Sequence, residues 1–243
     1  MLLDSLKDIV KHTHSLGFIE MVKLVGTPTT AKIEAIDADK TVVLYGDLYQ
    51  PIKEIDATIG LPRMAQLKGF IDLHGESVVT VETELRAAGE FPTELKFDDG
   101  DGDIASYRFM SETVVNDQIK VPPFKGAIWN VTFNPEKAKI DRLSQYSGVL
   151  GTFEKRFIVS TKNDVLNFSI GSGPTDRSNV PFAKGITGTL KHQWSWPLAQ
   201  VLSILKLNDN GNVTMYISDM GALKIDVDSG IGKYSYILPA TKA

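Results

Sequence analysis

The side chains that most often carry catalysis are few in this sequence. The four histidines are His12, His14, His74 and His192. His12 and His14 are two residues apart, and such a pair points to opposite sides of a helix, so it cannot chelate one metal ion. No serine stands in a nucleophile-elbow motif, and the chain has no cysteine. We therefore predict no catalytic residue and no metal site.

Two other segments suggest ligand binding, but their spacing does not support it. The glycine-rich segment 171–174 follows a strand pattern and lacks the spacing of a nucleotide-binding loop. The acidic run 98–103, DDGDGD, lacks the sixth-position glycine and twelfth-position glutamate of a calcium-binding EF-hand loop. We interpret the first as a connecting loop and the second as a solvated acidic turn. No cofactor is predicted, which favours a binding or structural protein over an enzyme.

Basic side chains recur on the outer faces of the four predicted helices. They are Lys7, Lys11 and His14 on the first helix, Arg63 and Lys68 on different faces of the second, Lys137, Lys139 and Arg142 on the third, and Lys206 on the fourth. Each alone reads as an ordinary solvated residue. Together they could attract phosphate groups without reading base sequence. They would face DNA only in a fold that sets the four helices side by side.

Helical periodicity covers four segments and strand alternation covers much of the remainder. The predicted helices span residues 3–16, 61–73, 134–150 and 196–207, with Asn134 and Ser195 as caps of the last two. Strand patterns cover residues 18–25, 30–37, 41–48, 77–85, 93–99, 105–112, 127–133, 156–161, 165–170, 185–194, 212–218, 222–228 and 234–240. Few helices among many strands indicate the α+β class.

The sequence contains an internal repeat. Residues 61–73, LPRMAQLKGFIDL, are echoed by residues 196–207, WPLAQVLSILKL, and each copy has its own amphipathic segment upstream. Such a repeat predicts two similar β-rich domains with two helices each. Pro122 and Pro123 cannot lie inside a helix, and the segment around them is interpreted as a linker. The predicted organisation is a domain at 1–115, a connector at 116–126 and a domain at 127–243.

Composition and charge narrow the choice of class. The chain has 42% hydrophobic and 23% charged residues, no cysteine for disulfides and no apolar run of membrane-spanning length. Residues 1–122 hold 12 Lys and Arg against 21 Asp and Glu, whereas residues 123–243 hold 14 against 9. This asymmetry is either drift between two solvated surfaces or the docking of an acidic half on the basic half of another molecule.

The order of elements, the proline-containing linker and the ending YSYILPA resemble the ring-shaped DNA polymerase sliding clamps. The stretch IKVPPFKGAIWNVTFNPEKAKIDRL and the segment LNFSIGSG are most similar to the clamps of T-even-type bacteriophages. The chain departs from the eukaryotic and archaeal clamps by ending at residues 241–243 without an acidic tail.

The resemblance implies a DNA clamp fold that assembles into a homotrimeric ring of six domains. It implies that the helices line the hole, so that the basic residues named above face double-stranded DNA. The ring would tether the replicative DNA polymerase for processive synthesis, and an ATP-dependent clamp loader would place it on DNA. The protein would act in the cytoplasm of an infected bacterial host and would have no enzymatic activity. The implied partner-binding groove comprises Ile119, Val121, Pro122, Ile237, Leu238 and Pro239.

Three alternatives remain open from the sequence. A phage virion or scaffold protein would also be β-rich, cysteine-free and oligomeric. An enzyme of unrecognised type would need a polar cleft with convergent titratable groups. A clamp relative could have another ring size or act as a monomeric loading accessory. The native mass distinguishes these most directly.

Overall fold

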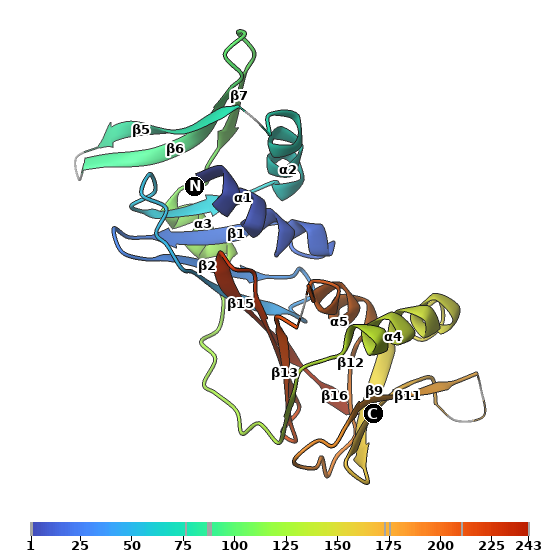
Figure 1. Cartoon of the computed structure of the whole chain (residues 1–243). Coiled ribbons are helices and arrows are strands. Elements are labelled where there is room, and N and C mark those ends of the chain that lie inside the picture. Colours follow the sequence, from blue (N-terminus) through green and yellow to red (C-terminus); the bar gives the residue numbers. More distant parts are fainter. Residues whose placement is uncertain are drawn as a thin grey trace. The chain divides into compact units, whose positions relative to one another are not determined.

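The chain divides into two compact units in the computed structural model (Figure 1). The structure describes residues 2–75, 77–86, 89–172, 174, 176–209 and 211–242. The first unit is Met1–Pro122 with Ser229–Tyr234, and the second is Pro123–Asp228 with Ser235–Ala243. The predicted loop at 171–174 lies partly outside the described residues, because Gly173 is not among them.

In its described residues, the first unit combines three α-helices and a 3-10 turn with two antiparallel sheets. Its elements are α1 (Leu2–Lys11), the 3-10 turn η1 (His14–Leu16), β1 (Val22–Gly26), β2 (Ala31–Ile36), β3 (Val43–Leu48), β4 (Thr58–Leu61), α2 (Met64–Leu73), β5 (Val78–Arg86), β6 (Gly89–Asp98), β7 (Ile104–Arg108) and α3 (Glu112–Gln118). One sheet has the order β4-β1-β2-β3 and continues into the first residues of β15 (Gly232–Pro239); the other has the order β5-β6-β7. Buried Leu24, Ile33 and Leu44 on the first sheet alternate with more exposed residues, as expected for a sheet covered on one face.

The second unit repeats this plan. Its elements are β8 (Val131–Phe133), α4 (Lys137–Leu150), β9 (Arg156–Lys162), β10 (Val165–Ile170), β11 (Ser178–Lys184), β12 (Trp194–Pro197), α5 (Leu198–Leu205), β13 (Val213–Ser218), β14 (Ala222–Asp228), the remainder of β15 and β16 (Thr241–Lys242). One sheet has the order β11-β10-β9-β12-β16 and the other the order β15-β14-β13-β8. Aromatic rings fill its core, with Phe157, Phe168 and Trp196 all 0% exposed.

The internal repeat is visible in the topology of the two units. The series α1-β1-β2-β3-β4-α2-β5-β6-β7 matches the series α4-β9-β10-β11-β12-α5-β13-β14-β15 element for element. The sheet orders match as well, since β4-β1-β2-β3 corresponds to β12-β9-β10-β11. The α+β class and the two similar units with two helices each are therefore confirmed. β8, α3 and β16 are additions to the shared plan.

Helix α1 is shorter than the predicted segment 3–16. The α-helix stops at Lys11, and the Thr13 hydroxyl donates a hydrogen bond to the Ile9 carbonyl at 2.5 Å. A threonine hydroxyl bonded four residues back competes with the backbone N–H for that carbonyl, so the next turn tightens into η1. His14 therefore lies on η1 and not on the α-helical face of Lys11. None of the helices in the described part of the chain is long and apolar enough to cross a membrane.

The two predicted helix caps are wrong. Helix α4 begins at Lys137, three residues after Asn134, whose side-chain amide donates to the Thr214 hydroxyl at 3.4 Å instead. Ser195 lies in β12, where its hydroxyl accepts a hydrogen bond from Arg156 Nε at 2.7 Å. In both cases a tertiary partner from another strand competes with the local capping bond that the sequence suggests.

One predicted strand and the connector also differ from the sequence pattern. Of the predicted strand 185–194 only Trp194 lies in a strand, β12, whereas residues 185–193 form bends and irregular backbone that follow the edge strand β11. Gly188 at φ 97° brings the chain against the Asn130 carbonyl, an arrangement that a regular strand does not allow. Helix α3 occupies the start of the segment interpreted as a linker and buries Val115 beside β4.

Candidate nucleic-acid interface

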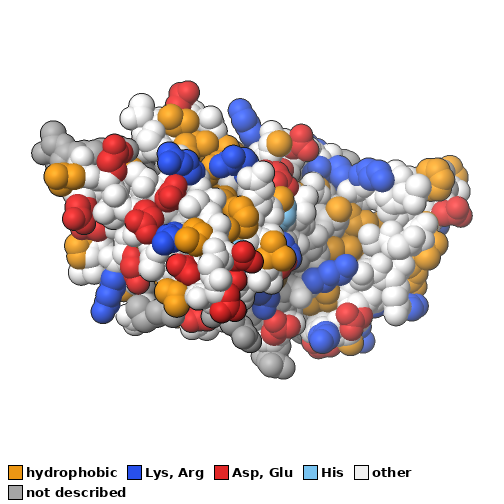
Figure 2. Space-filling model, turned by 90° about the horizontal axis from the view of Figure 1, so that it is seen from above, with side chains coloured by type: hydrophobic (Ala, Val, Ile, Leu, Met, Phe, Trp, Pro, Cys, Tyr) orange, Lys and Arg blue, Asp and Glu red, His pale blue; other side chains and the backbone are white. Residues whose placement is uncertain are grey.

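The basic residues of the helices are divided between the two units. Figure 2 shows Lys and Arg side chains lying among acidic and hydrophobic ones on the face seen from above. Helices α1 and α2 are in contact in the first unit, and α4 and α5 are in contact in the second.

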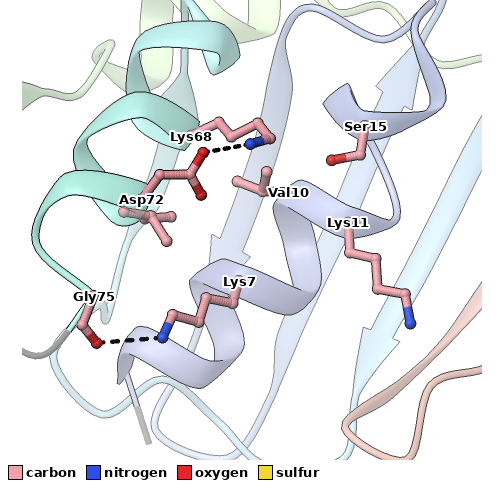
Figure 3. A pocket seen from close by; sticks show the side chains of 8 residues that line it. Lys7, Val10, Lys11, Ser15, Lys68, Asp72 and Gly75 are labelled. Carbon is pink, nitrogen blue, oxygen red and sulfur yellow. Dashed lines mark hydrogen bonds and ion pairs between the residues drawn. The ribbon is translucent and has the colours of Figure 1, made fainter.

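In the first unit, Lys7, Lys11 and Lys68 line one pocket between α1 and α2 (Figure 3). Lys68 forms an ion pair with Asp72 one turn further along α2. The Lys7 ammonium donates to the Gly75 carbonyl at 3.4 Å, which holds it over the end of α2. Three ammonium groups beside one carboxylate leave this surface positive overall, suited to a phosphate that is bound loosely.

The other two candidates in this unit do not line that pocket. His14 is 19% exposed on its side chain, and its Nδ1 lies 3.5 Å from the Glu20 carboxylate. A half-buried imidazole beside a carboxylate is better placed to hold η1 than to bind phosphate. Arg63 is exposed, with φ 50°, immediately before α2.

The start of α2 is fixed by a buried tyrosine. The Tyr107 hydroxyl on β7 donates a hydrogen bond to the Pro62 carbonyl. Burial raises the pKa of Tyr107, and the positive charge of Arg63 opposes that rise. The tyrosine stays protonated as a donor, so α2 and its Lys68 are held at a defined height against the β5-β6-β7 sheet.

In the second unit, the basic residues lie mostly on α4. Lys137 and Arg142 are exposed, and Lys139 is half-buried. Arg142 is positioned by its own helix, since its guanidinium donates to Gln145 Oε1 at 3.1 Å and to the Tyr146 hydroxyl at 3.0 Å and lies over the Tyr146 ring. These contacts pre-orient the guanidinium while leaving other N–H groups to bind an anion. Lys206 follows α5 and is exposed.

The acidic run 98–103 forms a turn closed by its own carboxylate. Asp99 Oδ1 accepts hydrogen bonds from the backbone N–H groups of Asp101 at 2.9 Å and Asp103 at 3.1 Å. Among the residues with described positions, no group of three or more His, Cys, Asp or Glu side chains could hold a metal ion.

The residues predicted for the partner groove differ widely in exposure. In the first unit Ile119 is buried, Val121 is half-buried and Pro122 is exposed. In the second unit Leu238 is 0% exposed, Ile237 is half-buried and Pro239 is exposed. Leu238 was predicted to line the groove, but its side chain is buried within β15.

The burial of Leu238 has a clear cause. Strand β15 runs on to Pro239 and β16 follows it. The Leu238 carbonyl accepts a hydrogen bond from the indole of buried Trp196 at 3.1 Å. The Leu238 side chain is therefore part of the core of the second unit.

An exposed apolar patch at the end of α4 was not predicted. Phe153 is 88% exposed and Val149 is 74% exposed, and both line a pocket with Tyr146, Leu150 and Arg177. The sequence signal was available, because these apolar positions fall outside the inward stripe formed by Ile140 and Leu143. Exposed apolar clusters of this kind commonly mark protein contacts.

Comparison with known proteins supplies the remaining observation. No protein-family model matches the sequence, and no curated protein is similar to it. A structure of A. fulgidus PCNA with the C-terminal region of FEN-1 bound aligns over 100% of this chain and 97% of that chain, with a TM-score of 0.74 and 11% identity. The chain has the PCNA fold.

Two further structures give the same result. PCNA from Thermococcus kodakaraensis aligns over 98% of both chains with a TM-score of 0.71 and 12% identity. Proliferating Cellular Nuclear Antigen from Entamoeba histolytica aligns over 97% of this chain and 94% of that chain, with a TM-score of 0.68 and 10% identity. The PCNA fold spans both units, and each unit is one copy of the internal repeat.

Proposed function

We propose that this protein is a sliding clamp: a non-enzymatic ring that encircles double-stranded DNA and tethers a DNA polymerase. The observation that carries the proposal is the PCNA fold over the whole chain, with basic side chains on a helix pair of each repeat. Fold alone does not assign a function. Here the charged residues stand on the elements that the sequence resemblance assigns to the DNA-facing surface.

The basic residues suit loose contact with phosphates. The charge of Lys68 is partly neutralised by Asp72, and the Arg142 guanidinium is hydrogen-bonded to Gln145 and Tyr146. Charges engaged in this way attract the DNA backbone without holding one register. A ring retained by its topology needs no tight contact and can slide.

Ring assembly is supported by the edges of the sheets. In the first unit, β3 is paired with the start of β15 in antiparallel fashion, with Leu48 beside Gly232 and Gly46 beside Tyr234. The repeat makes β11 the counterpart of β3, and β7 the counterpart of β15. Both lie at sheet edges with no outer partner strand in the described ranges. We propose that β11 of one chain pairs with β7 of the next.

Opposite charges and an exposed apolar patch near the two strands support this pairing. The acidic turn 98–103 directly precedes β7, and Lys184 ends β11, so an antiparallel pairing brings them together. The patch at Val149 and Phe153 would be covered by the neighbouring chain. A head-to-tail contact gives a closed ring when the rotation between chains closes. The family resemblance implies closure with three chains of 26.7 kDa, or about 80 kDa in total.

The partners follow from the same proposal. A polymerase and an ATP-dependent clamp loader would bind through short apolar peptides to the exposed or half-exposed residues among the groove candidates, which are Val121, Pro122, Ile237 and Pro239. The resemblance of residues 119–143 to T-even-type phage clamps supports a phage protein that works in the cytoplasm of an infected host.

Two measurements test the proposal. Native mass spectrometry at micromolar concentration should give a trimer, and loading onto nicked circular DNA should give a complex that survives high salt until the circle is cut. A monomer at all concentrations would contradict the ring. Equal retention on linear and circular DNA would contradict encirclement, because only a closed ring depends on the DNA topology.

A further inference from the structure

Strand β5 presents an open sheet edge. It is the outer strand of the β5-β6-β7 sheet, and none of the residues whose positions are described forms a strand on its other side. The strand extends over nine residues, Val78–Arg86, which is long for an edge strand. The outward-facing N–H and C=O groups of an edge strand can receive another strand.

The second repeat shows what this edge can accept. The counterpart of β5 is β13, whose outer edge is covered by β8. The pairing is antiparallel, with Phe133 opposite Met215 and Val131 opposite Ile217. Within the described ranges the sheet thus has four strands in this unit, β15-β14-β13-β8, and three in the other. The two repeats therefore differ at this edge. In the second unit β8 pairs with it, whereas in the first no described strand does.

The side chains of β5 are arranged to meet such a strand. Val79 and Val81 are half-buried, whereas Thr80 and Glu82 on the opposite face are exposed. At the beginning of the strand Val78 is 67% exposed. In β13, by contrast, alternate residues are fully buried. An added strand would therefore place its apolar residues on the face of Val79 and Val81 and its polar residues beside Glu82.

The surface around this edge is acidic. Glu82 and Glu84 are exposed on β5, and Asp98 and Asp99 line a pocket at the beginning of the strand. The one cation of that pocket, Lys96, is 3.7 Å from Asp98 and so is already engaged. The left part of Figure 2, over β5 and β6, shows acidic and hydrophobic side chains next to one another. Complementary charge on the incoming strand must be positive.

A bulge limits the usable part of the edge. The register between β5 and β6 shifts between Glu82 and Thr83, where Pro92 stands on β6. The extra residue of the bulge is Thr93 on β6, and the register between β5 and β6 is unbroken from Val78 to Glu82, so the regular segment at the start of β5 is Val78–Glu82. This segment is long enough to receive a short added strand such as β8, which has three residues.

We propose that the outer edge of β5 at Val78–Glu82 binds an extended segment of a partner protein by antiparallel strand addition. The segment has alternating apolar and basic residues. A second copy of β5 is disfavoured as the occupant, because a symmetric antiparallel pair would set the acidic residues of one strand against those of the other. The inference stands on the difference between the repeats and does not require the ring.

The probe is a synthetic peptide, acetyl-Lys-Val-Lys-Phe-Lys-Val-Lys-amide, with binding followed by NMR and by amide hydrogen exchange of the full chain. Binding should slow exchange at residues 78–82 and leave β13 unchanged. A control peptide of equal charge with glycine in place of Val and Phe should bind much more weakly. Equal binding of both peptides would overturn the proposal, since charge alone would then explain the affinity.

Two matched variants complete the test. Glu82→Lys should weaken peptide binding by about fivefold or more, whereas Glu54→Lys, on an exposed loop of the same unit, should leave it unchanged. Equal effects of the two variants would overturn the proposal. Self-association that Glu82→Lys alters would assign the edge to a second copy and would also overturn it. Failure of the ring appears separately, as a monomeric native mass with peptide binding intact.

Discussion

The Tyr234 hydroxyl donates a hydrogen bond to Asp8 Oδ2 at 2.7 Å and so joins the last long strand to the first helix. The Ser229 hydroxyl donates to the same carboxylate oxygen at 2.9 Å. The Tyr234 ring stacks on His12 with 4.2 Å between ring centroids. Asp8 and Tyr234 are both buried, at 7% and 0% exposure. The first unit is therefore completed by residues from the far end of the sequence.

Removing this hydroxyl should destabilise the first unit. Tyr234→Phe keeps the ring and its stacking on His12 but deletes the donor to a buried carboxylate. Hydrogen bonds to charged groups contribute about 1.5–3 kcal/mol, so urea unfolding should show a loss in that range. A double-mutant cycle with Asp8→Asn should give a coupling energy of the same sign. Strictly additive effects would show that the two side chains do not interact in solution.

The same carboxylate should make stability depend on pH. Burial raises the pKa of Asp8, but hydrogen bonds from His12, Tyr234 and Ser229 and the charge of His12 outweigh it and hold the pKa below its ordinary value. A carboxyl with a lowered folded-state pKa contributes stability that is present above the unfolded pKa, about 4, and is lost as pH falls through the folded value. The wild-type chain should lose stability more steeply below about pH 4 than Asp8→Asn does. Parallel urea midpoints for the two proteins from pH 6 to pH 3 would contradict this.

Part of this architecture could be predicted from the sequence because local patterns determine it. The helical period of the apolar residues predicts the first helix, and Gly17, with φ 86°, ends the turn η1 that follows it. The repeat of 61–73 in 196–207 gave two similar units. The basic residues of α1 were correctly placed on an exposed face, since solvation of Lys7 and Lys11 depends only on the helix period.

The features that could not be predicted from the sequence depend on contacts between residues far apart in the chain. The role of Asp8 could not be predicted, because the two hydroxyls that donate hydrogen bonds to its carboxylate belong to residues more than 200 positions away in the chain. Leu238 was expected to be accessible, since nothing local shows that Trp196 covers this strand. The proposed ring edges and the open edge of β5 follow from sheet order, which no single strand pattern encodes.

Two glycines near β11 should respond differently to alanine. A Cβ on Gly188, at φ 97°, would lie 1.8 Å from the Asn130 carbonyl oxygen, which forces backbone movement. Gly185 has φ 65° but open space around its Cβ position. Gly185→Ala should cost about 1 kcal/mol, from backbone conformation alone, and Gly188→Ala clearly more. Thermal unfolding measures both, and equal losses would show that the approach to Asn130 is not rigid.

Substitutions at the neighbouring residues Leu238 and Pro239 should have different effects on stability and on partner binding. Leu238→Ala removes a fully buried side chain and should cost about 2–5 kcal/mol in urea unfolding. Pro239→Ala alters an exposed residue and should leave stability within about 0.5 kcal/mol. If the partner proposal holds, Pro239→Ala should nevertheless weaken binding of a polymerase-derived peptide. Undiminished peptide binding by a folded Pro239→Ala protein would remove this residue from the partner site.

The basic helix faces should act through salt-sensitive contact with DNA. Replacing Lys7, Lys11, Lys139 and Arg142 with alanine removes charge from both helix pairs while leaving the proposed ring edges intact. DNA-stimulated processivity should fall, and the slope of log affinity against log salt should become shallower by about 1 for each lost phosphate contact. The matched control replaces Lys32, Lys53, Lys162 and Lys191, which are exposed and lie outside the helices. Since both variants lose four positive charges, equal effects would assign the DNA response to net charge, and only a selective loss supports the helices as the DNA-facing surface.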